Sequence, residues 1–426
     1  MAGLLRRSGY GLARERGEAD ILLVNTCGFI GPAMRESIDT IVELGEYRRR
    51  GRCRALVVTG CLSQRHPEEL LAELPEVDAV VGTGEYPRLA EVLDRVLQGE
   101  RVLRVGAAGA EYPEDLPRAG AVKAGSAYLK LAEGCERRCS FCTIPALRGP
   151  HRSRPPRRIV AEARSLVEQG ARELVLISQD TTYYGRDLER RPALADLLRQ
   201  LAPLEGLEWI RVMYAYPTEV TGQLLEAMAT LPRVARYLDL PLQHASPRVL
   251  RAMRRGGDAE QLLRLLERVR RAVPGIVLRT TFMVGFPGES EADFAQLLDF
   301  MREAQFDHVG VFPYFQEEGT PAAEMAGQVP EEVKQERYRR AMECQQPIAR
   351  RQNRLRVGKL TRVLVERTDG RRGTARGRWE GQAPEVDGSV YVRGAGAAAG
   401  GGEMLAVRIT GVRGYDLVAE VAPPAG

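Results

Sequence analysis

With 426 residues, the chain is too long for one ordinary hydrophobic core, so two or three domains are expected. A hydrophobic content of 44% and a charged content of 28% exclude a disordered or fibrous protein. The formal net charge of +5 is too small to predict nucleic-acid binding by itself, although it permits RNA nearby.

The chain shows no signal for a membrane or for export. No apolar run approaches the roughly 20 residues that a spanning helix needs, and the first residues lack the apolar core of a secretory signal. We therefore expect a cytoplasmic protein that contacts no membrane. In that reducing compartment the seven cysteines favour metal binding, catalysis or simple burial over a disulfide framework.

The first predicted domain covers residues 1–105. Three apolar runs, at residues 19–27, 54–61 and 77–85, alternate with helical stretches. This alternation predicts a parallel, flavodoxin-like sheet. Residues 106–124 are rich in Gly, Ala and Pro without a periodic face, which is typical of a linker.

The second predicted domain, residues 125–355, contains six further strand patterns and ends in a charged helix over 331–355. The patterns lie at 127–135, 173–180, 209–217, 236–246, 276–289 and 308–315. Helical stretches follow the first five, so we expect a partial (β/α)6 barrel in an α/β protein. Functional groups of such barrels lie at the carboxyl ends of the strands.

The third predicted domain, residues 356–426, consists of short strands and fits a small OB-like β-barrel. The run AGAAAGGG at 395–402 is expected to be a loop rather than an element. Eleven Lys and Arg against eight Asp and Glu in this domain are too evenly balanced to identify a ligand.

Cys135, Cys139 and Cys142 lie within eight residues, just after the first barrel strand. A structural zinc site would need a fourth ligand, and His151 is the nearest histidine. Iron and sulfur suit the spacing better, because thiolates are the usual cluster ligands. Three of them leave one iron open for a substrate or cofactor.

Cys27 and Cys61 each follow a predicted parallel strand. Parallel strands end along one edge of their sheet, so these two thiols could share a second cluster. The alternative is that both are small buried residues. Cys53 precedes its strand and is expected at the opposite edge, while Cys344 in the charged helix is expected to be structural.

The CxxxCxxC spacing, with Phe141 before its last cysteine, resembles the radical S-adenosylmethionine superfamily. The resemblance implies that the open iron binds S-adenosyl-L-methionine, whose reductive cleavage yields a 5′-deoxyadenosyl radical. Surrounding arginines would favour thiolate ligands and an anionic substrate, unless they only form a solvated basic loop. They are Arg137, Arg138, Arg148, Arg152 and Arg154.

The domain order, with a TRAM-type β domain last, resembles the methylthiotransferases over essentially the whole chain. The RimO type is indicated by NTCGFI (25–30), TGCLSQR (59–65), ISQDTTYYGRD (177–187), LDLPLQHAS (238–246) and VGFPGE (284–289). The resemblance implies methylthiolation of an aspartate β-carbon in ribosomal protein twelve of the small subunit. It also implies two 4Fe-4S clusters, S-adenosyl-L-methionine and an electron donor such as reduced flavodoxin.

Two other readings stay open. A tRNA adenosine could be the substrate instead, or the chain could be a non-catalytic iron–sulfur protein that binds RNA or the ribosome. The family takes three cysteines for its auxiliary cluster, whereas this domain offers Cys27 and Cys61. We expect that the opening strand and its cysteine are missing because the start codon is placed too late, with a natural truncation as the alternative.

The resemblance places contacts to S-adenosyl-L-methionine at Gln179, Asp180 and Thr181, after the second barrel strand. Asp180 could instead cap the following helix. Gly285 and Gly288, around Pro287, would let the backbone approach the cofactor, although a turn also explains them. Tyr183, Tyr184 and His244 would line the substrate mouth or pack in the core.

Overall fold

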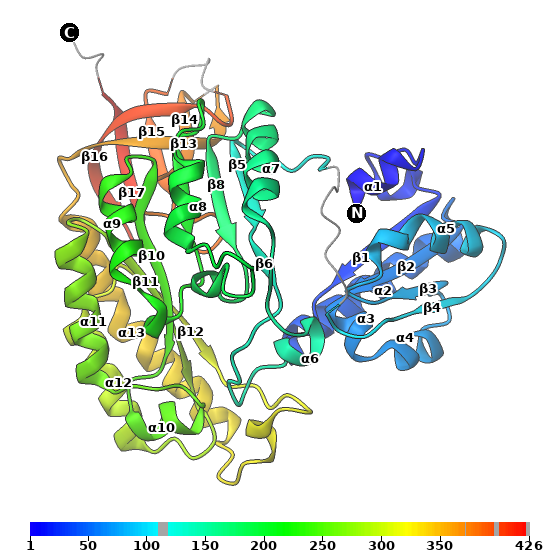
Figure 1. Cartoon of the computed structure of the whole chain (residues 1–426), viewed down its shortest axis with the longest axis horizontal. Coiled ribbons are helices and arrows are strands. Elements are labelled where there is room, and N and C mark those ends of the chain that lie inside the picture. Colours follow the sequence, from blue (N-terminus) through cyan, green and yellow to red (C-terminus); the bar gives the residue numbers. More distant parts are fainter. Residues whose placement is uncertain (110–117, 371, 396–399, 423–426) are drawn as a thin grey trace. The chain divides into compact units, whose positions relative to one another are not determined.

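The computed structural model describes residues 1–109, 118–370, 372–395 and 400–422, so the centre of the predicted linker lies outside the described residues. The described chain divides into two compact units (Figure 1). The first contains residues 1–120, 133–152 and 315–323. The second contains residues 121–132, 153–314 and 324–426. The domain limits expected from sequence stay a prediction.

The first unit is built on a four-stranded parallel sheet in the order β1-β2-β3-β4. Its strands are β1 (Ile21–Thr26), β2 (Ala55–Gly60), β3 (Ala79–Val81) and β4 (Val102–Arg104). Its helices are α1 (Ala2–Arg7), α2 (Gly31–Arg50), α3 (Cys61–Arg65), α4 (Pro67–Glu73), α5 (Leu89–Leu97) and α6 (Ile144–Arg148). The three predicted strands are confirmed, whereas β4 was missed because its three residues carry no long apolar run.

Burial explains why these strands form the centre of the unit. Every residue of β2 is buried, as expected for an inner strand covered on both faces. Helix α5 is strongly amphipathic and buries Leu89, Val92, Leu93 and Val96 against one face of the sheet. Helix α2 buries Ile41 and Leu44 in a second cluster with the alternate strand residues.

The second unit contains the six predicted strands, which form a parallel sheet in the order β12-β11-β10-β9-β8-β5. The strands are β5 (Ser126–Lys130), β8 (Glu173–Ile177), β9 (Trp209–Val212), β10 (Val234–Gln243), β11 (Val277–Val284) and β12 (His308–Pro313). The two-residue strands β6 (Ala132–Glu133) and β7 (Arg152–Ser153) pair with each other.

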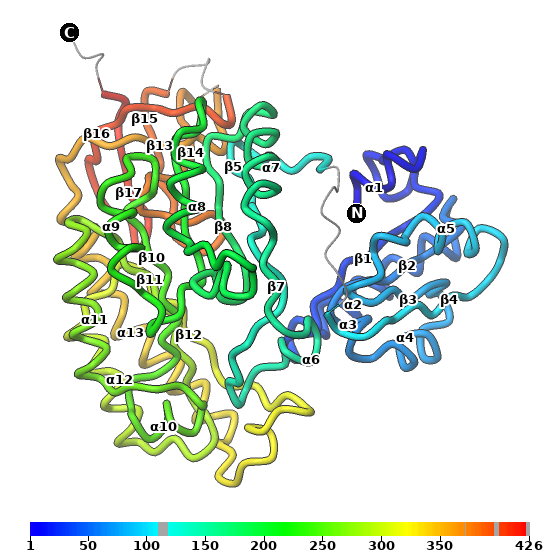
Figure 2. Tube along the Cα trace, viewed as in Figure 1, coloured from blue at the N-terminus to red at the C-terminus, as the bar shows by residue number. Residues whose placement is uncertain are grey.

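Helices follow these strands along the chain, as the trace in Figure 2 shows. They are α7 (Pro156–Glu168), α8 (Leu194–Leu201), α9 (Gly222–Thr230), α10 (Pro247–Ala252), α11 (Ala259–Ala272), α12 (Glu291–Ala304) and α13 (Glu331–Arg354). Short 3₁₀ turns lie at Arg16–Glu18, Tyr86–Arg88, Thr181–Tyr183 (η3), Pro217–Glu219 and Pro321–Glu324. Leu, Val and Phe side chains from α7, α8, α9, α11 and α12 form one core with the sheet.

The chain ends in a closed five-stranded barrel in the order β13-β14-β15-β17-β16. Its strands are β13 (Leu360–Asp369), β14 (Thr374–Trp379), β15 (Val390–Arg393), β16 (Met404–Arg413) and β17 (Asp416–Val421). The predicted small β-barrel and the α/β class are therefore confirmed. Strand β14 was missed because its sequence, TARGRW, is mostly polar or small.

A buried ionic network joins this barrel to the six-stranded sheet. Glu173, the first residue of β8, accepts hydrogen bonds from Arg211 Nε at 2.8 Å and Arg378 Nη2 at 2.6 Å. Burial alone would raise the pKa of Glu173, but the two guanidinium charges outweigh it and lower that pKa to about 2. The network lies at the amino ends of the strands, away from the predicted functional edge.

Candidate functional site: two thiol sites in one compact unit

Cys27 and Cys61 both lie at the carboxyl edge of the four-stranded sheet. Thr26 and Gly60 are register partners at the ends of β1 and β2, and each cysteine comes next along the chain. The loop after β1 packs directly on the start of α3, since a Cβ on Gly28 would lie 2.7 Å from the carbonyl carbon of Cys61. The predicted common edge is confirmed.

A guanidinium lies beside one of these sulfurs. Arg148 Nη2 donates to Cys61 Sγ at 3.0 Å, and Arg148 Nη1 donates to Glu133 Oε1 at 3.1 Å. Cys61 is buried, whereas Cys27 is exposed. Arg148 was expected only as one of several arginines near the cysteine triplet, and the structure places its charge at the other thiol site.

Cys135, Cys139 and Cys142 lie on one loop of the same unit, between β6 and α6. The loop is closed by the Cys135 N–H, which donates to Gly149 O at 3.1 Å. A second hydrogen bond, from the Cys142 N–H to Cys139 O at 3.1 Å, forms a turn at the end of the loop. Gly134 has a φ of +80°, and a Cβ there would lie 2.0 Å from Pro150 O, so only glycine fits.

The donor chemistry of this loop fits an iron–sulfur cluster. Three sulfur donors, each half-exposed, share eight residues, and thiolates are the ligands that such clusters take. Within the described ranges, no three His, Cys, Asp or Glu side chains are gathered closely enough to hold a metal ion. His151, the alternative fourth ligand for zinc, is buried at the end of the loop, where its backbone N–H donates to Glu136 Oε1.

The residues expected to contact S-adenosyl-L-methionine lie in the second unit. Gln179 and Asp180 follow β8, and Thr181 opens the turn η3. The Asp180 carboxylate caps that turn, accepting from Tyr183 N at 3.2 Å and from Thr182 Oγ1 at 2.6 Å. Asp180 therefore makes the capping contact that was the alternative to cofactor binding. Cofactor binding by these residues stays a prediction.

Gly285 and Gly288 follow β11 with φ values of +72° and +76°. A Cβ on Gly285 would lie 2.3 Å from Lys334 Cγ, so packing against α13 already requires a glycine. Tyr184 is buried, and its hydroxyl donates to Arg154 O at 2.9 Å. This hydrogen bond is an internal packing contact of Tyr184.

Sequence reasoning named His244 but missed the buried polar cluster that it forms with Glu289 and Arg337 after β10 and β11. Glu289 Oε1 lies 3.3 Å from Arg337 Nη1, and His244 Nδ1 accepts from Ser246 N at 2.9 Å. Three buried atoms, His244 Nε2, Glu289 Oε1 and Arg337 Nε, have no hydrogen-bond partner among the described residues. Glu289 belongs to the VGFPGE segment, where the glycines alone were singled out.

Burial controls the charge of this cluster. It raises the pKa of Glu289 to about 7, although the neighbouring Arg337 opposes the shift. Burial also lowers the pKa of His244 to about 3. Because His244 Nδ1 accepts a hydrogen bond, its imidazole is neutral with the proton on Nε2.

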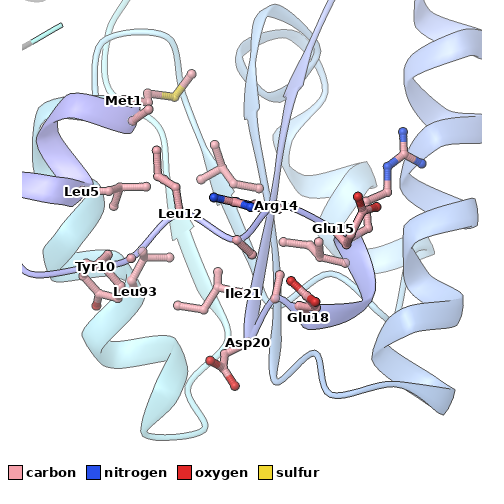
Figure 3. Close-up of a pocket in the computed structure, with 17 residues that line it drawn as sticks. Met1, Leu5, Tyr10, Leu12, Arg14, Glu15, Glu18, Asp20, Ile21 and Leu93 are labelled. Carbon is pink, nitrogen blue, oxygen red and sulfur yellow. The ribbon is translucent and has the colours of Figure 1, made fainter. Parts of the chain in front are cut away.

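A pocket of about 630 Å³ lies elsewhere in the first unit (Figure 3). Apolar side chains including Met1, Leu5, Leu12 and Ile21 line it, together with Leu93 from α5. It contains none of the candidate site residues. Cavity volume therefore does not identify the chemistry of this protein.

Family models match all three parts of the chain. The Radical SAM superfamily matches residues 129–301, and the TRAM domain matches residues 357–422. Residues 1–82 match a family described as "Uncharacterized protein family UPF0004". No helix in the described part of the chain is long and apolar enough to cross a membrane.

Solved structures support the fold. The chain is similar to the radical S-adenosylmethionine methyltransferase TsrM from Kitasatospora setae, with a TM-score of 0.52 and 17% identity. The similarity covers 72% of this chain and 64% of that chain. At this identity the comparison supports the fold alone.

Curated relatives are similar over nearly the whole length. The ribosomal protein uS12 methylthiotransferase RimO of Symbiobacterium thermophilum is 54% identical over 100% of this chain and 88% of that protein. The protein of the same name from Desulforudis audaxviator is 52% identical, covering 99% of this chain and 93% of that protein. With this identity over both lengths, the chain belongs to the RimO family of radical S-adenosylmethionine methylthiotransferases.

Proposed function

We propose that this protein replaces a hydrogen on the β-carbon of an aspartate in ribosomal protein uS12 with a methylthio group. Its nearly full-length similarity to named uS12 methylthiotransferases supports the substrate. The structural observation that carries the proposal is that two thiol sites, at Cys27/Cys61 and at Cys135/Cys139/Cys142, belong to one compact unit.

Each thiol site has a separate task in this proposal. Cys135, Cys139 and Cys142 would hold a 4Fe-4S cluster that supplies the electron for cleavage of S-adenosyl-L-methionine. Cys27 and Cys61 would take part in holding a second cluster, which carries sulfur. The reaction needs radical chemistry because the aspartate β-carbon has an unactivated C–H bond that a side-chain base cannot deprotonate at a useful rate.

The residues of this chain orient and shield that chemistry. Arg148 lies against Cys61 and places a positive charge at the second site. Asp180, in its capped turn, and the turn through Gly285 and Gly288 follow β8 and β11, where parallel sheets bind ligands. We propose that these positions contact S-adenosyl-L-methionine. A reduced flavodoxin or a similar donor would supply electrons in the cytoplasm, where ribosomal proteins are made.

The test is an anaerobic assay of the reconstituted protein with S-adenosyl-L-methionine, a reductant and uS12 in one reaction or bulk tRNA in another. We expect a mass increase on uS12 equal to one methylthio group replacing hydrogen, located on an aspartate. A methylthio nucleoside in tRNA without change in uS12 would instead establish the tRNA alternative. Absence of cofactor cleavage would support the non-catalytic reading.

A further inference from the structure

A nine-residue strap, Phe315–Ala323, follows β12 but is part of the first compact unit. It therefore packs with segments that precede it by more than 170 residues, namely the four-stranded sheet and the cysteine loop. Neither proposed catalytic task uses it. Its sequence, FQEEGTPAA, carries two consecutive carboxylates in an otherwise uncharged stretch.

Glu317 is the buried centre of the strap, with 4% of its surface exposed. Its Oε2 accepts from Arg65 Nη1 at 2.7 Å, and its Oε1 accepts from the Gly31 N–H at 2.7 Å. Gly31 is the first residue of α2, a 20-residue helix that has no side-chain cap. The carboxylate thus contacts a helix amino terminus and a half-buried guanidinium together.

Arg65 extends the same network to both strand ends of the sheet. It lies in α3, which begins at Cys61. Arg65 Nη1 also donates to the carbonyl of Gly28, the residue after Cys27, at 3.0 Å. Its Nη2 donates to Glu318 O in the strap at 3.1 Å. One guanidinium therefore links the Cys27 segment, the Cys61 helix and the strap.

The other end of the strap holds the cysteine loop. The Ala322 N–H donates to the carbonyl of Ser140 at 2.9 Å, and Ser140 lies between Cys139 and Cys142. Thr320 folds the strap between its two anchors, since its hydroxyl donates to Glu317 O at 2.7 Å. A single short segment thus contacts all three thiol-bearing segments of the unit.

We propose that Glu317, held by Arg65, is a positioning residue that fixes the Cys27/Cys61 edge and the cysteine loop relative to each other. This inference rests on the proposed function, because its consequence is coupling between cofactor cleavage at one thiol site and methylthio transfer from the other. Loss of the ion pair would loosen the Arg65 anchor directly and the Ser140 anchor through the strap, while every cysteine of the two thiol sites is retained.

The test is Glu317→Gln, which keeps the side-chain size but removes the charge. A charged hydrogen bond is worth about 1.5–3 kcal/mol, so we expect amide hydrogen exchange to rise at least about tenfold. This rise should occur in the strap, at residues 28–31 and at residues 139–142, in enzyme without bound clusters. In reconstituted enzyme, the ratio of 5′-deoxyadenosine to modified uS12 should rise by a similar factor.

Asp307→Asn is the matched control. Asp307 also pairs with a half-buried arginine, Arg356 Nη2 at 2.5 Å, and also accepts from a backbone N–H, that of Leu278 at 2.9 Å. It precedes β12, at the end of the strand away from the strap. Its variant should leave exchange in the thiol segments and the product ratio unchanged.

Arg65→Lys provides a second variant should Glu317→Gln fold poorly, because it retains the charge and loses the forked contacts. It should raise exchange in the same segments by less than Glu317→Gln does. Increased exchange confined to the strap, or an unchanged product ratio, would overturn the positioning role. If wild-type enzyme leaves uS12 unmodified, the proposed function fails, and unchanged exchange in the thiol segments would then overturn the strap proposal separately.

Discussion

The two parallel sheets of this protein use the same edge for different chemistry. At the carboxyl ends of β1 and β2 the four-stranded sheet carries sulfur, with Cys27 and Cys61 one residue beyond paired strand ends. At the carboxyl ends of β10 and β11 the six-stranded sheet carries His244, Glu289 and positive-φ glycines. The backbone geometry of parallel strands supplies a position for a site in both sheets. The side chains at that position decide what each sheet can bind.

The sheets also differ in how exposed those residues are. At the thiol edge Cys27 is exposed and Cys61 is buried, whereas His244 and Glu289 are both buried. The cluster proposed at the thiol edge would have to be delivered to its ligands through the exposed side of Cys27, whereas a neutral histidine and a protonatable carboxyl need the absence of water to keep their shifted pKa values. Solvent access therefore distinguishes the thiol edge from the buried polar cluster.

Replacing Cys135, Cys139 and Cys142 together by alanine is the most severe way to break this comparison. Cofactor cleavage should fall to background, and the iron content should fall by one cluster, because the loop loses every sulfur donor. Cys344→Ala, in α13, is the control and should change neither. Cleavage of S-adenosyl-L-methionine by the triple variant would refute the assignment of this loop.

Cys61→Ser tests the thiol edge of the small sheet. Modification of uS12 should fall at least about 100-fold, since loss of even an outer partner of a metal ligand costs about 10–100-fold. Formation of 5′-deoxyadenosine should continue, because the cysteine loop is intact. Cys53→Ser, at the opposite end of β2, should retain full modification. Equal loss in both variants would mean that Cys61 acts only in packing.

Glu173→Gln tests the amino end of the six-stranded sheet, where polar residues serve stability. Removing one partner of a buried ion pair costs about 3–5 kcal/mol, and denaturant unfolding would measure it. Glu366→Gln touches the same Arg378 from a more exposed position and should cost about 1 kcal/mol or less. The pKa of Glu173 is lowered, so its contribution is present above pH 4.5 and is lost as the pH falls toward 2.

Glu289→Gln sharpens the comparison at the carboxyl edge. The folded pKa of about 7 lies above the ordinary value of 4.5, so the folded state binds the proton more tightly. The stability due to Glu289 is complete below pH 4.5 and is lost as the pH rises through 7, a change of up to about 3 kcal/mol. Unfolding of both proteins at several pH values measures it, and a constant difference would contradict the buried protonatable carboxyl.

The His244 contribution has the opposite sign. Its lowered pKa gives stability that is present above pH 6.5 and lost as the pH falls toward 3. Both the parent protein and the Glu289→Gln variant retain His244. The difference between their unfolding curves therefore isolates Glu289.

Local patterns in the sequence predicted much of the fold. Apolar runs predicted β1, β2 and β3 and all six strands of the larger sheet, because buried parallel strands are nearly continuous in hydrophobic residues. Strands β4 and β14 were not predicted, because they are short or polar. Their formation depends on neighbours that complete a sheet or a barrel rather than on their own composition.

By itself, the sequence determined the thiol spacing of residues 135–142 and the strand ends that carry Cys27 and Cys61, since both are properties of a few consecutive residues. Only the tertiary structure brought Arg65 to Glu317, 252 residues later, and Arg148 to Cys61. A charged residue has no local signal for its partner, because its contacts depend on how distant segments fold together. Burial and charge pairing between distant segments of the chain therefore decided the arrangement of the thiol sites.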